Sequence, residues 1–196
     1  PVKKAPAKKS NEDQFDLFGF SDESDEPTAN HSYYATLENT THFYQIIQGD
    51  LPVKLLMQNL LNQTSVCFDT ETTGIDALNA ELVGMSFSFE KGKGFYVPFP
   101  ENQEEAQTLI EKFRPFFENE SIEKIGQNMK YDMKILSNYN IQVKGKLFDT
   151  MIAHYLINPD MRHNMDVLSE TYLKYSPKSI ETLIGKKGKN QLSMRD

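Results

Sequence analysis

Five consecutive residues, Ser65–Asp69, already limit the class of fold that this chain can adopt. Their apolar side chains point to both faces of a β-strand, which is typical of a strand in the middle of a covered sheet. Residues 82–89 and 95–99 alternate apolar and small polar residues around a turn with Gly92 and Gly94, and they predict a β-hairpin. Segments with helical spacing lie before and after these strands. The sequence therefore predicts an α/β fold with a mixed sheet flanked by helices.

Helices are predicted where apolar residues recur at helical spacing. The first is expected to begin near Asp50, with either Asp50 or the loop around it as the cap, and its apolar stripe consists of Val53, Leu56 and Leu60. Further helices are expected at about 103–117, 128–139, 149–157 and 165–175, and a short strand is expected at 122–125. Asp149 is predicted to be the N-cap of the helix over 149–157.

The composition fits one domain with its own core. The 196 residues are 38% hydrophobic, and no apolar run approaches the roughly 18 residues that a membrane-spanning helix needs, so no membrane contact is expected. Cys67 is the only cysteine, so an internal disulfide is excluded and a reducing, cytoplasmic location is favoured. Because a nucleophilic thiol needs exposure and a nearby base, we expect Cys67 to pack in the core instead.

The first 30 residues differ in composition from the rest of the chain. Residues 1–30 are rich in Lys, Pro, Ser, Asp and Glu, and we expect them to form a flexible interdomain linker, with the folded domain at 31–196. Within the linker, Gln14, Leu17 and Phe18 resemble the Gln-x-x-Leu-Phe peptides by which bacterial replication proteins dock on the sliding clamp. A linker segment without function is an equally open alternative, because five-residue motifs arise by chance.

Charge is distributed unevenly along the chain. The formal net charge of −7 divides into +4 for residues 1–10, −7 for 11–30, −9 for 31–123 and +5 for 124–196. An acidic part beside a basic part would suit a cation-binding site next to a surface that follows a phosphate backbone. An ordinary, uneven solvated surface explains the same distribution equally well.

Asp69 and Glu71 are the first candidates for chemistry. They end the central strand, and because side chains alternate along a strand, both carboxylates project from one face. Two adjacent anions repel one another unless a divalent cation lies between them, and Mg²⁺ is typically held by a few carboxylates together with water. For these two residues taken alone, a solvated acidic turn is the alternative.

Asn128 and Asp132 are the second candidates. They lie four residues apart and therefore on one face of a predicted helix, with Lys130 and Tyr131 beside them. Alternatively, Asp132 is an ordinary exposed helix acid and Asn128 lies near the helix cap. Taken together, the strand end and this helical turn favour a shared cation site.

Both segments belong to a longer series of motifs. The series comprises Phe68–Thr72 (FDTET), Leu82–Phe87 (LVGMSF), Gly126–Asp132 (GQNMKYD), Phe148–Met151 (FDTM), Arg162–Asp166 (RHNMD) and Gly188–Leu192 (GKNQL). It resembles the 3′ to 5′ proofreading exonuclease domain of bacterial DNA polymerase I (family A), in the DEDD exonuclease superfamily. The resemblance implies an RNase H-like fold and a 3′ to 5′ exodeoxyribonuclease within a DNA-directed DNA polymerase that acts in DNA replication and repair.

The resemblance also implies a two-metal-ion site for Mg²⁺ or Mn²⁺. Asp69 would bridge the two ions, Glu71 would bind the first and orient the attacking water, and Asp132 would serve the second. Contacts to the 3′ end of single-stranded DNA are implied for Thr72, Ile75, Gln127, Asn128, Lys130, Tyr131 and Arg162. The expected partners are this DNA, the polymerase domain of the same chain and the sliding clamp, for a monomeric protein at the nucleoid.

One motif of the family is missing from this sequence. The family completes its site with Tyr-x-x-x-Asp, but the tyrosines after Asp132 are followed four residues later by Val143, Pro159, Ser176 and Ser179. We therefore expect a domain truncated before its last catalytic motif, which by itself is weakly active or inactive. Two alternatives stay open: a catalytically silent module that holds DNA or docks on the sliding clamp, and a stand-alone DEDD exonuclease.

Overall fold

The structure is a computed structural model that describes residues 34–185, 192, 194 and 195. The predicted linker over 1–30, with Gln14, Leu17 and Phe18, lies outside the described residues. Within the part of the chain that the structure describes, no helix combines the length and the apolar character that crossing a membrane requires.

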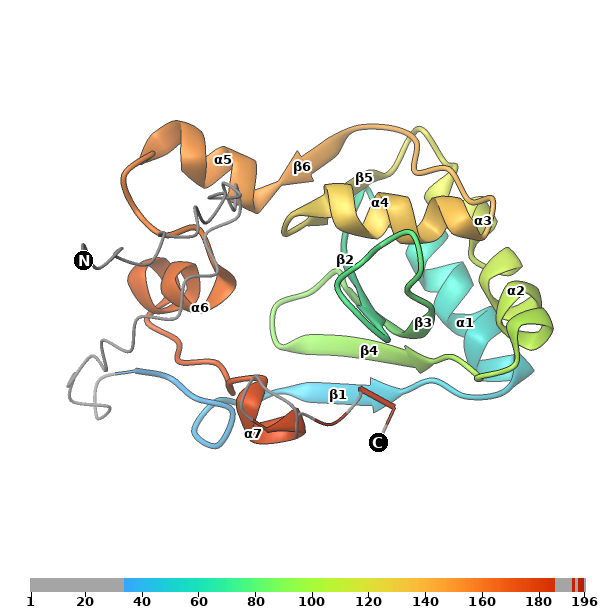
Figure 1. Cartoon of the computed structure of the whole chain (residues 1–196), viewed down its shortest axis with the longest axis horizontal. Helices are drawn as coiled ribbons and strands as arrows, with labels where there is room; N and C mark the ends of the chain where they lie inside the picture. The colour runs from blue at the N-terminus through green and yellow to red at the C-terminus, as the bar shows by residue number, and fades with distance from the viewer. Residues whose placement is uncertain (1–33, 186–191, 193, 196) are drawn as a thin grey trace, which may run out of the picture. The chain divides into compact units, whose positions relative to one another are not determined.

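A six-stranded mixed sheet forms the centre of the described structure (Figure 1). Its strands are β1 (Phe43–Ile46), β2 (Ser65–Thr72), β3 (Leu82–Ser88), β4 (Lys93–Pro98), β5 (Glu123–Gly126) and β6 (Leu147–Asp149), in the order β1-β4-β3-β2-β5-β6. The β2–β3 and β3–β4 pairs are antiparallel, whereas β1–β4, β2–β5 and β5–β6 are parallel. The predicted hairpin is confirmed as β3–β4, and β2 lies inside the sheet between β3 and β5.

Seven α-helices are seen in the described residues. They are α1 (Asp50–Leu61), α2 (Gln103–Glu111), α3 (Arg114–Phe117), α4 (Met129–Asn138), α5 (Thr150–Ile157), α6 (Met165–Leu168) and α7 (Glu181–Ile184), and a π-helical turn covers Ser169–Leu173. The predicted N-cap of α5 is confirmed, because the Asp149 carboxylate accepts hydrogen bonds from the N–H groups of Met151 and Ile152.

Two of the predicted helices differ from the structure in their limits. The helix expected over 103–117 is divided into α2 and α3, because Pro115 lacks the N–H that a continuous helix needs and stands in the first turn of α3. The helix expected over 165–175 begins as α6 and continues as the π-helical turn. Of the two caps expected for α1, the structure has the loop residue, because Gly49 is the N-cap and the Asp50 carboxylate pairs with Lys112 at 2.5 Å.

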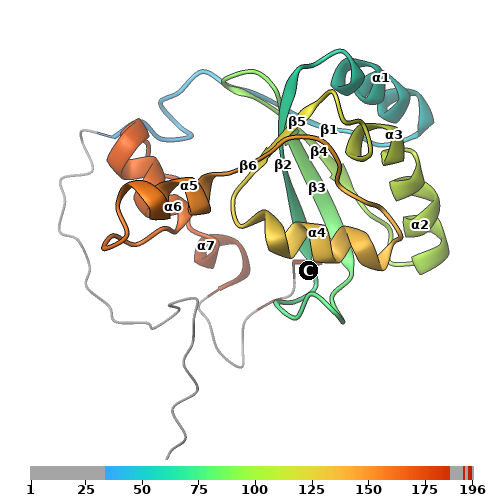
Figure 2. The ribbon, with the colours of Figure 1, turned by 90° about the horizontal axis from the view of Figure 1, so that it is seen from above.

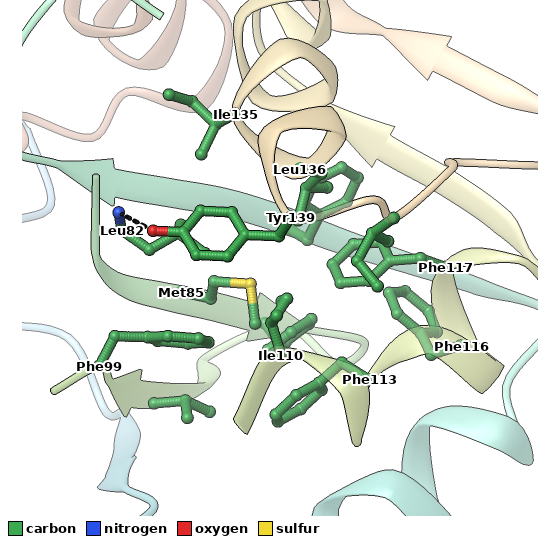
Figure 3. Packing of buried hydrophobic residues seen from close by; sticks show 14 of the residues in the cluster. Leu82, Met85, Phe99, Ile110, Phe113, Phe116, Phe117, Ile135, Leu136 and Tyr139 are labelled. Atoms are coloured by element: carbon green, nitrogen blue, oxygen red, sulfur yellow. Dashed lines mark hydrogen bonds between the residues drawn. The ribbon is translucent and has the colours of Figure 1, made fainter. Parts of the chain in front are cut away.

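The hydrophobic core lies between the sheet and helices α1 to α4 (Figure 2). The predicted apolar stripe of α1 is confirmed, because Val53, Leu56 and Leu60 are all buried. Figure 3 shows the phenylalanines of the α2–α3 segment packed near α4, whose last turn leads into Tyr139. The hydroxyl of Tyr139 accepts a hydrogen bond from the Leu82 N–H at 3.0 Å and so ties α4 to the start of β3.

The two faces of β2 differ in burial. Its even-numbered residues Val66, Phe68 and Thr70 are buried and form what we call the helix-covered face. Its odd-numbered residues Cys67, Asp69 and Glu71 are exposed or half-buried and form the carboxylate face. The prediction that Cys67 packs in the core is therefore wrong, because strand alternation points the thiol to the carboxylate face, where it is exposed. The sequence predicted that both faces of this strand are covered, but only the helix-covered face is buried.

Candidate functional site

Asp69 and Glu71 project together from the carboxylate face of β2. The strand register sets Asp69 opposite Ser86 and Glu71 opposite Gly84 on β3, and both carboxyl-bearing side chains are half-buried. The pairing becomes irregular directly after Glu71, where the register with β3 shifts. The predicted placement of these two carboxylates on one face at the end of the strand is confirmed.

Asp132 reaches the same strand from the first turn of α4. The pairing of β2 with β5 ends at Cys67, and beyond that point the Thr70 N–H donates to Oδ1 of Asp132 at 3.0 Å. The Thr70 hydroxyl donates to the same oxygen at 2.6 Å. Asp132 is only 3% exposed, so it is not the solvent-exposed helix acid that the sequence left as an alternative. The third carboxylate is thus anchored to the residue that lies between Asp69 and Glu71.

The three carboxylates influence one another electrostatically. Burial and the negative charges of Asp132 and Glu71 raise the pKa of Asp69 to about 7. Burial and the charge of Asp132 likewise raise the pKa of Glu71. Burial also raises the pKa of Asp132, although its hydrogen bonds from Thr70 act in the opposite direction. A cluster of this kind is electrostatically strained until a cation neutralises it.

The donor set of this cluster fits a hard divalent cation. Carboxylate oxygens are the protein ligands that Mg²⁺ prefers, and Mg²⁺ usually retains several waters and substrate oxygens rather than a full protein cage. Among the described residues, no group of three or more His, Cys, Asp and Glu side chains lies in an arrangement that could hold a metal ion by itself. An ion at this cluster would therefore need water or substrate oxygens besides the carboxylates of Asp69, Glu71 and Asp132.

Asp149 supports this site in a way that the sequence did not reveal. Besides capping α5, its carboxylate accepts hydrogen bonds from the N–H groups of Asn128 and Met129, at 3.1 and 2.8 Å. One side chain therefore fixes the start of both α4 and α5. The sequence signalled only the α5 cap, because the second set of donors lies about 20 residues earlier in the chain.

Thr72, Tyr131 and Ile75 gather around the loop that follows β2. The hydroxyls of Thr72 and Tyr131 are 2.6 Å apart, and both donate to the carbonyl oxygen of Gly74. Ile75, the next residue, is 96% exposed. Its apolar side chain is therefore available for contact, whereas the Tyr131 ring is half-buried and packs against the core.

The remaining predicted DNA contacts lie near the start of α4 and in the loop after α5. Asn128 adopts a left-handed conformation with φ of 56°, and Lys130 is exposed. Both ends of the Gln127 amide make hydrogen bonds. Its Nε2 donates to the His163 carbonyl at 2.6 Å, and its Oε1 accepts from the Thr150 hydroxyl. Gln127 thus ties the loop with the exposed Arg162 to the start of α4.

The sequence of this chain is similar to those of known proteins. A family model of 3′–5′ exonucleases matches residues 44–195. The chain is 35% identical over 183 residues to DNA polymerase I of Borreliella burgdorferi and 32% identical over 159 residues to that of Pseudomonas aeruginosa. These alignments cover 91% and 76% of this chain but only 19% and 17% of the two polymerases.

The fold agrees as well. The solved structure of Brucella melitensis NrnC with bound Mg²⁺ is similar, with a TM-score of 0.56 and 21% identity over 71% of this chain and 65% of NrnC. The mixed sheet with flanking helices is thus the predicted RNase H-like fold of DEDD exonucleases. By sequence and by fold, this chain belongs to the family of 3′–5′ exonuclease domains that occurs in bacterial DNA polymerase I.

Proposed function

We propose that this chain removes nucleotides from the 3′ end of single-stranded DNA by hydrolysis of the terminal phosphodiester. Asp69, Glu71 and Asp132 are the proposed catalytic residues and the proposed ligands of two divalent ions, Mg²⁺ or Mn²⁺. In the longer protein this activity would proofread DNA during replication and repair in the cytoplasm, at the nucleoid. The expected partners there are a polymerase domain of the same chain and, through Gln14, Leu17 and Phe18, the sliding clamp.

The observation that carries the proposal is the position of Asp132. It lies 62 residues beyond Thr70 in the chain, yet its carboxylate accepts two hydrogen bonds from Thr70. Thr70 is the residue between Asp69 and Glu71 on β2. Burial and neighbouring negative charges raise the pKa values of all three carboxyl groups. Their ionised forms therefore destabilise the fold, and such groups are typical of functional sites. Their meeting at the end of a strand supports a site for cations and phosphate.

The chain's own residues have distinct tasks in this proposal. When bound, the divalent ions supply an activated water and stabilise the leaving oxyanion. Thr70 holds Oδ1 of Asp132 with two hydrogen bonds and so fixes the direction of the other carboxylate oxygen. Asp69 and Glu71 present their carboxylates from the same face, where burial and neighbouring negative charge raise the pKa of both groups. A divalent cation would compete with protons for these oxygens.

The proposed DNA contacts surround this cluster. Ile75 would lie against a base face, as aliphatic and aromatic side chains do in single-strand binding sites, and Tyr131 would support the loop that carries it. Arg162 and Lys130 are exposed cations for backbone phosphates, while Thr72, Gln127 and Asn128 supply polar groups at the two loops. A single strand fits, because a site that cuts the terminal linkage needs an unpaired end.

A nuclease assay on the full 196-residue chain tests the proposal. We expect slow shortening of 5′-labelled single-stranded DNA from its 3′ end, dependent on Mg²⁺ or Mn²⁺. The substitution Asp69→Ala should abolish the shortening, since it would remove a proposed ligand of the divalent ions. Unchanged digestion by this variant would overturn the assignment of the metal ligands.

One observation favours a second candidate, a catalytically silent module that holds DNA. The sequence has no Tyr-x-x-x-Asp after Asp132, so the fourth carboxylate of the family pattern is missing. The same assay separates the two candidates. Binding of the labelled strand without shortening, at any concentration of divalent cation, would support the silent module.

A further inference from the structure

Gly84 on β3 is a glycine because Tyr96 occupies the space of its side chain. A Cβ atom at Gly84 would stand 2.0 Å from the Tyr96 hydroxyl oxygen and 2.3 Å from the ring carbon that carries it. Gly84 has no left-handed backbone conformation that would call for glycine on its own account. The absence of a side chain at this position therefore serves the close approach of the phenol.

The strand register places this phenol on the carboxylate face. Gly84 pairs with Glu71 across β2 and β3, and Ser86 pairs with both Asp69 and Tyr96. Side chains of directly opposed residues point to the same face, with Cβ atoms about 4.5–5.5 Å apart. The Tyr96 side chain crosses from the position opposite Ser86 to the position of Gly84, so its hydroxyl lies over Gly84, the residue that pairs with Glu71.

The electrostatics agree with this proximity. Burial, together with the negative charge of Glu71, raises the pKa of Tyr96. A tyrosine phenol is in any case protonated at neutral pH and is therefore a donor. An O–H donor beside a carboxylate forms a short, charge-assisted hydrogen bond when the two groups meet. A ring packed over a glycine has few alternative positions, which lowers the entropy cost of holding that donor in place.

We propose that Tyr96 is a positioning residue for Glu71, whose carboxylate it orients by a hydrogen bond from the phenol hydroxyl, and that Gly84 is required to admit it. The inference rests on the proposed function, because it assumes that Glu71 is a metal ligand. It adds two residues, one on β3 and one on β4, to a site that the sequence limited to β2 and α4.

Binding of Mn²⁺ to the full chain, measured by calorimetry, tests the proposal. We expect Tyr96→Phe, which keeps the ring and removes only the hydroxyl, to weaken Mn²⁺ binding about three- to tenfold, the size of one lost hydrogen bond. Gly84→Ala should weaken binding similarly by displacing the ring, and the double variant should be no worse than either single one. Non-additivity of this kind indicates that both changes remove the same interaction.

Tyr44→Phe is the matched control. Tyr44 is an exposed tyrosine on β1 whose ring lies beside Gly94, at 3.0 Å from where a Cβ would stand, and it is not part of the proposed site. Its Mn²⁺ affinity should equal that of the unaltered chain.

Glu71→Gln separates a failure of the inference from a failure of the proposed function. Weak binding by Glu71→Gln together with unchanged binding by Tyr96→Phe would overturn the role of Tyr96 alone. Unchanged affinity in both variants, or no Mn²⁺ binding by the unaltered chain, would overturn the metal site and the inference together. A lower melting temperature of Tyr96→Phe at unchanged affinity would mean that the phenol only packs.

Discussion

Neighbouring residues on the two faces of β2 make opposite contributions to stability. On the helix-covered face, Phe68 is 2% exposed and its ring meets that of Phe117 edge-on, with centroids 5.2 Å apart. On the carboxylate face, Asp69 is half-buried beside two other acids, and its pKa is raised to about 7. One face therefore stabilises the fold, whereas the other carries groups whose ionised forms destabilise it. Such a cost is expected where side chains are arranged for a ligand rather than for packing.

The largest effect is expected on the helix-covered face. Phe68→Ala should lower the free energy of unfolding by about 3–5 kcal/mol, because it removes a buried ring and leaves a cavity among aromatic neighbours. Urea denaturation followed by circular dichroism measures this change. Cys67→Ala, one position away on the carboxylate face, is the control and should change stability by less than about 0.5 kcal/mol. Similar losses for the two variants would contradict the division between the faces.

An effect of opposite sign is expected at Asp69. Its folded pKa of about 7 lies above the ordinary aspartate value of 3.8, so the folded state holds a proton that the unfolded chain releases. The stability of the unaltered protein should therefore fall as the pH rises from about 4 to about 7. Asp69→Asn should reduce this decline, although the raised pKa values of Glu71 and Asp132 leave part of it. The substitution should raise the free energy of unfolding above pH 7, by on the order of 2 kcal/mol.

Denaturation at a series of pH values without divalent cations measures this second effect. Added Mn²⁺ should stabilise the unaltered protein and leave Asp69→Asn nearly unaffected, because binding to the folded state alone raises stability. An Asn variant that is less stable than the unaltered protein at pH 8 would contradict the electrostatic cost.

The smallest effect is expected at Thr70, where the two faces meet. Thr70 is buried on the helix-covered face, yet its hydroxyl donates to Asp132 at 2.6 Å. Thr70→Val keeps the shape and removes this donor, so we expect a loss of about 1 kcal/mol in stability and a further rise in the pKa of Asp132. Carbon-detected NMR titration of the Asp132 carboxyl measures the pKa. An unchanged titration would mean that the backbone N–H of Thr70 alone holds the carboxylate.

Much of the core was predictable because its apolar residues follow the periods of helices and strands. The stripe of Val53, Leu56 and Leu60 and the hairpin of β3 and β4 are buried or paired as expected. The strands β1 and β6 were not predicted. All four residues of β1 are exposed, and β6 has three residues, so neither shows the alternation of burial by which a strand is recognised.

The segment after the core is held together differently. Among the described residues beyond Ile141, only His154 and Ser169 are buried. Nδ1 of His154 lies 2.7 Å from Nδ1 of His163, and Nε2 of His154 lies 3.0 Å from the Tyr172 hydroxyl. Polar contacts of this kind leave no hydrophobic period in the sequence, which explains why the π-helical turn over 169–173 was not predicted.

The sequence by itself determined the fold class, the pair of carboxylates on one face of β2 and the family, because these depend on local periodicity and on contiguous motifs. Only the tertiary structure decided that Asp132 is anchored to Thr70, that Asp149 fixes two helices, and that the Tyr96 ring lies over Gly84, opposite Glu71. These contacts join residues about 20 to 60 positions apart, and they arise only when helices pack on the sheet and strands take their register. No spacing along the chain encodes that juxtaposition.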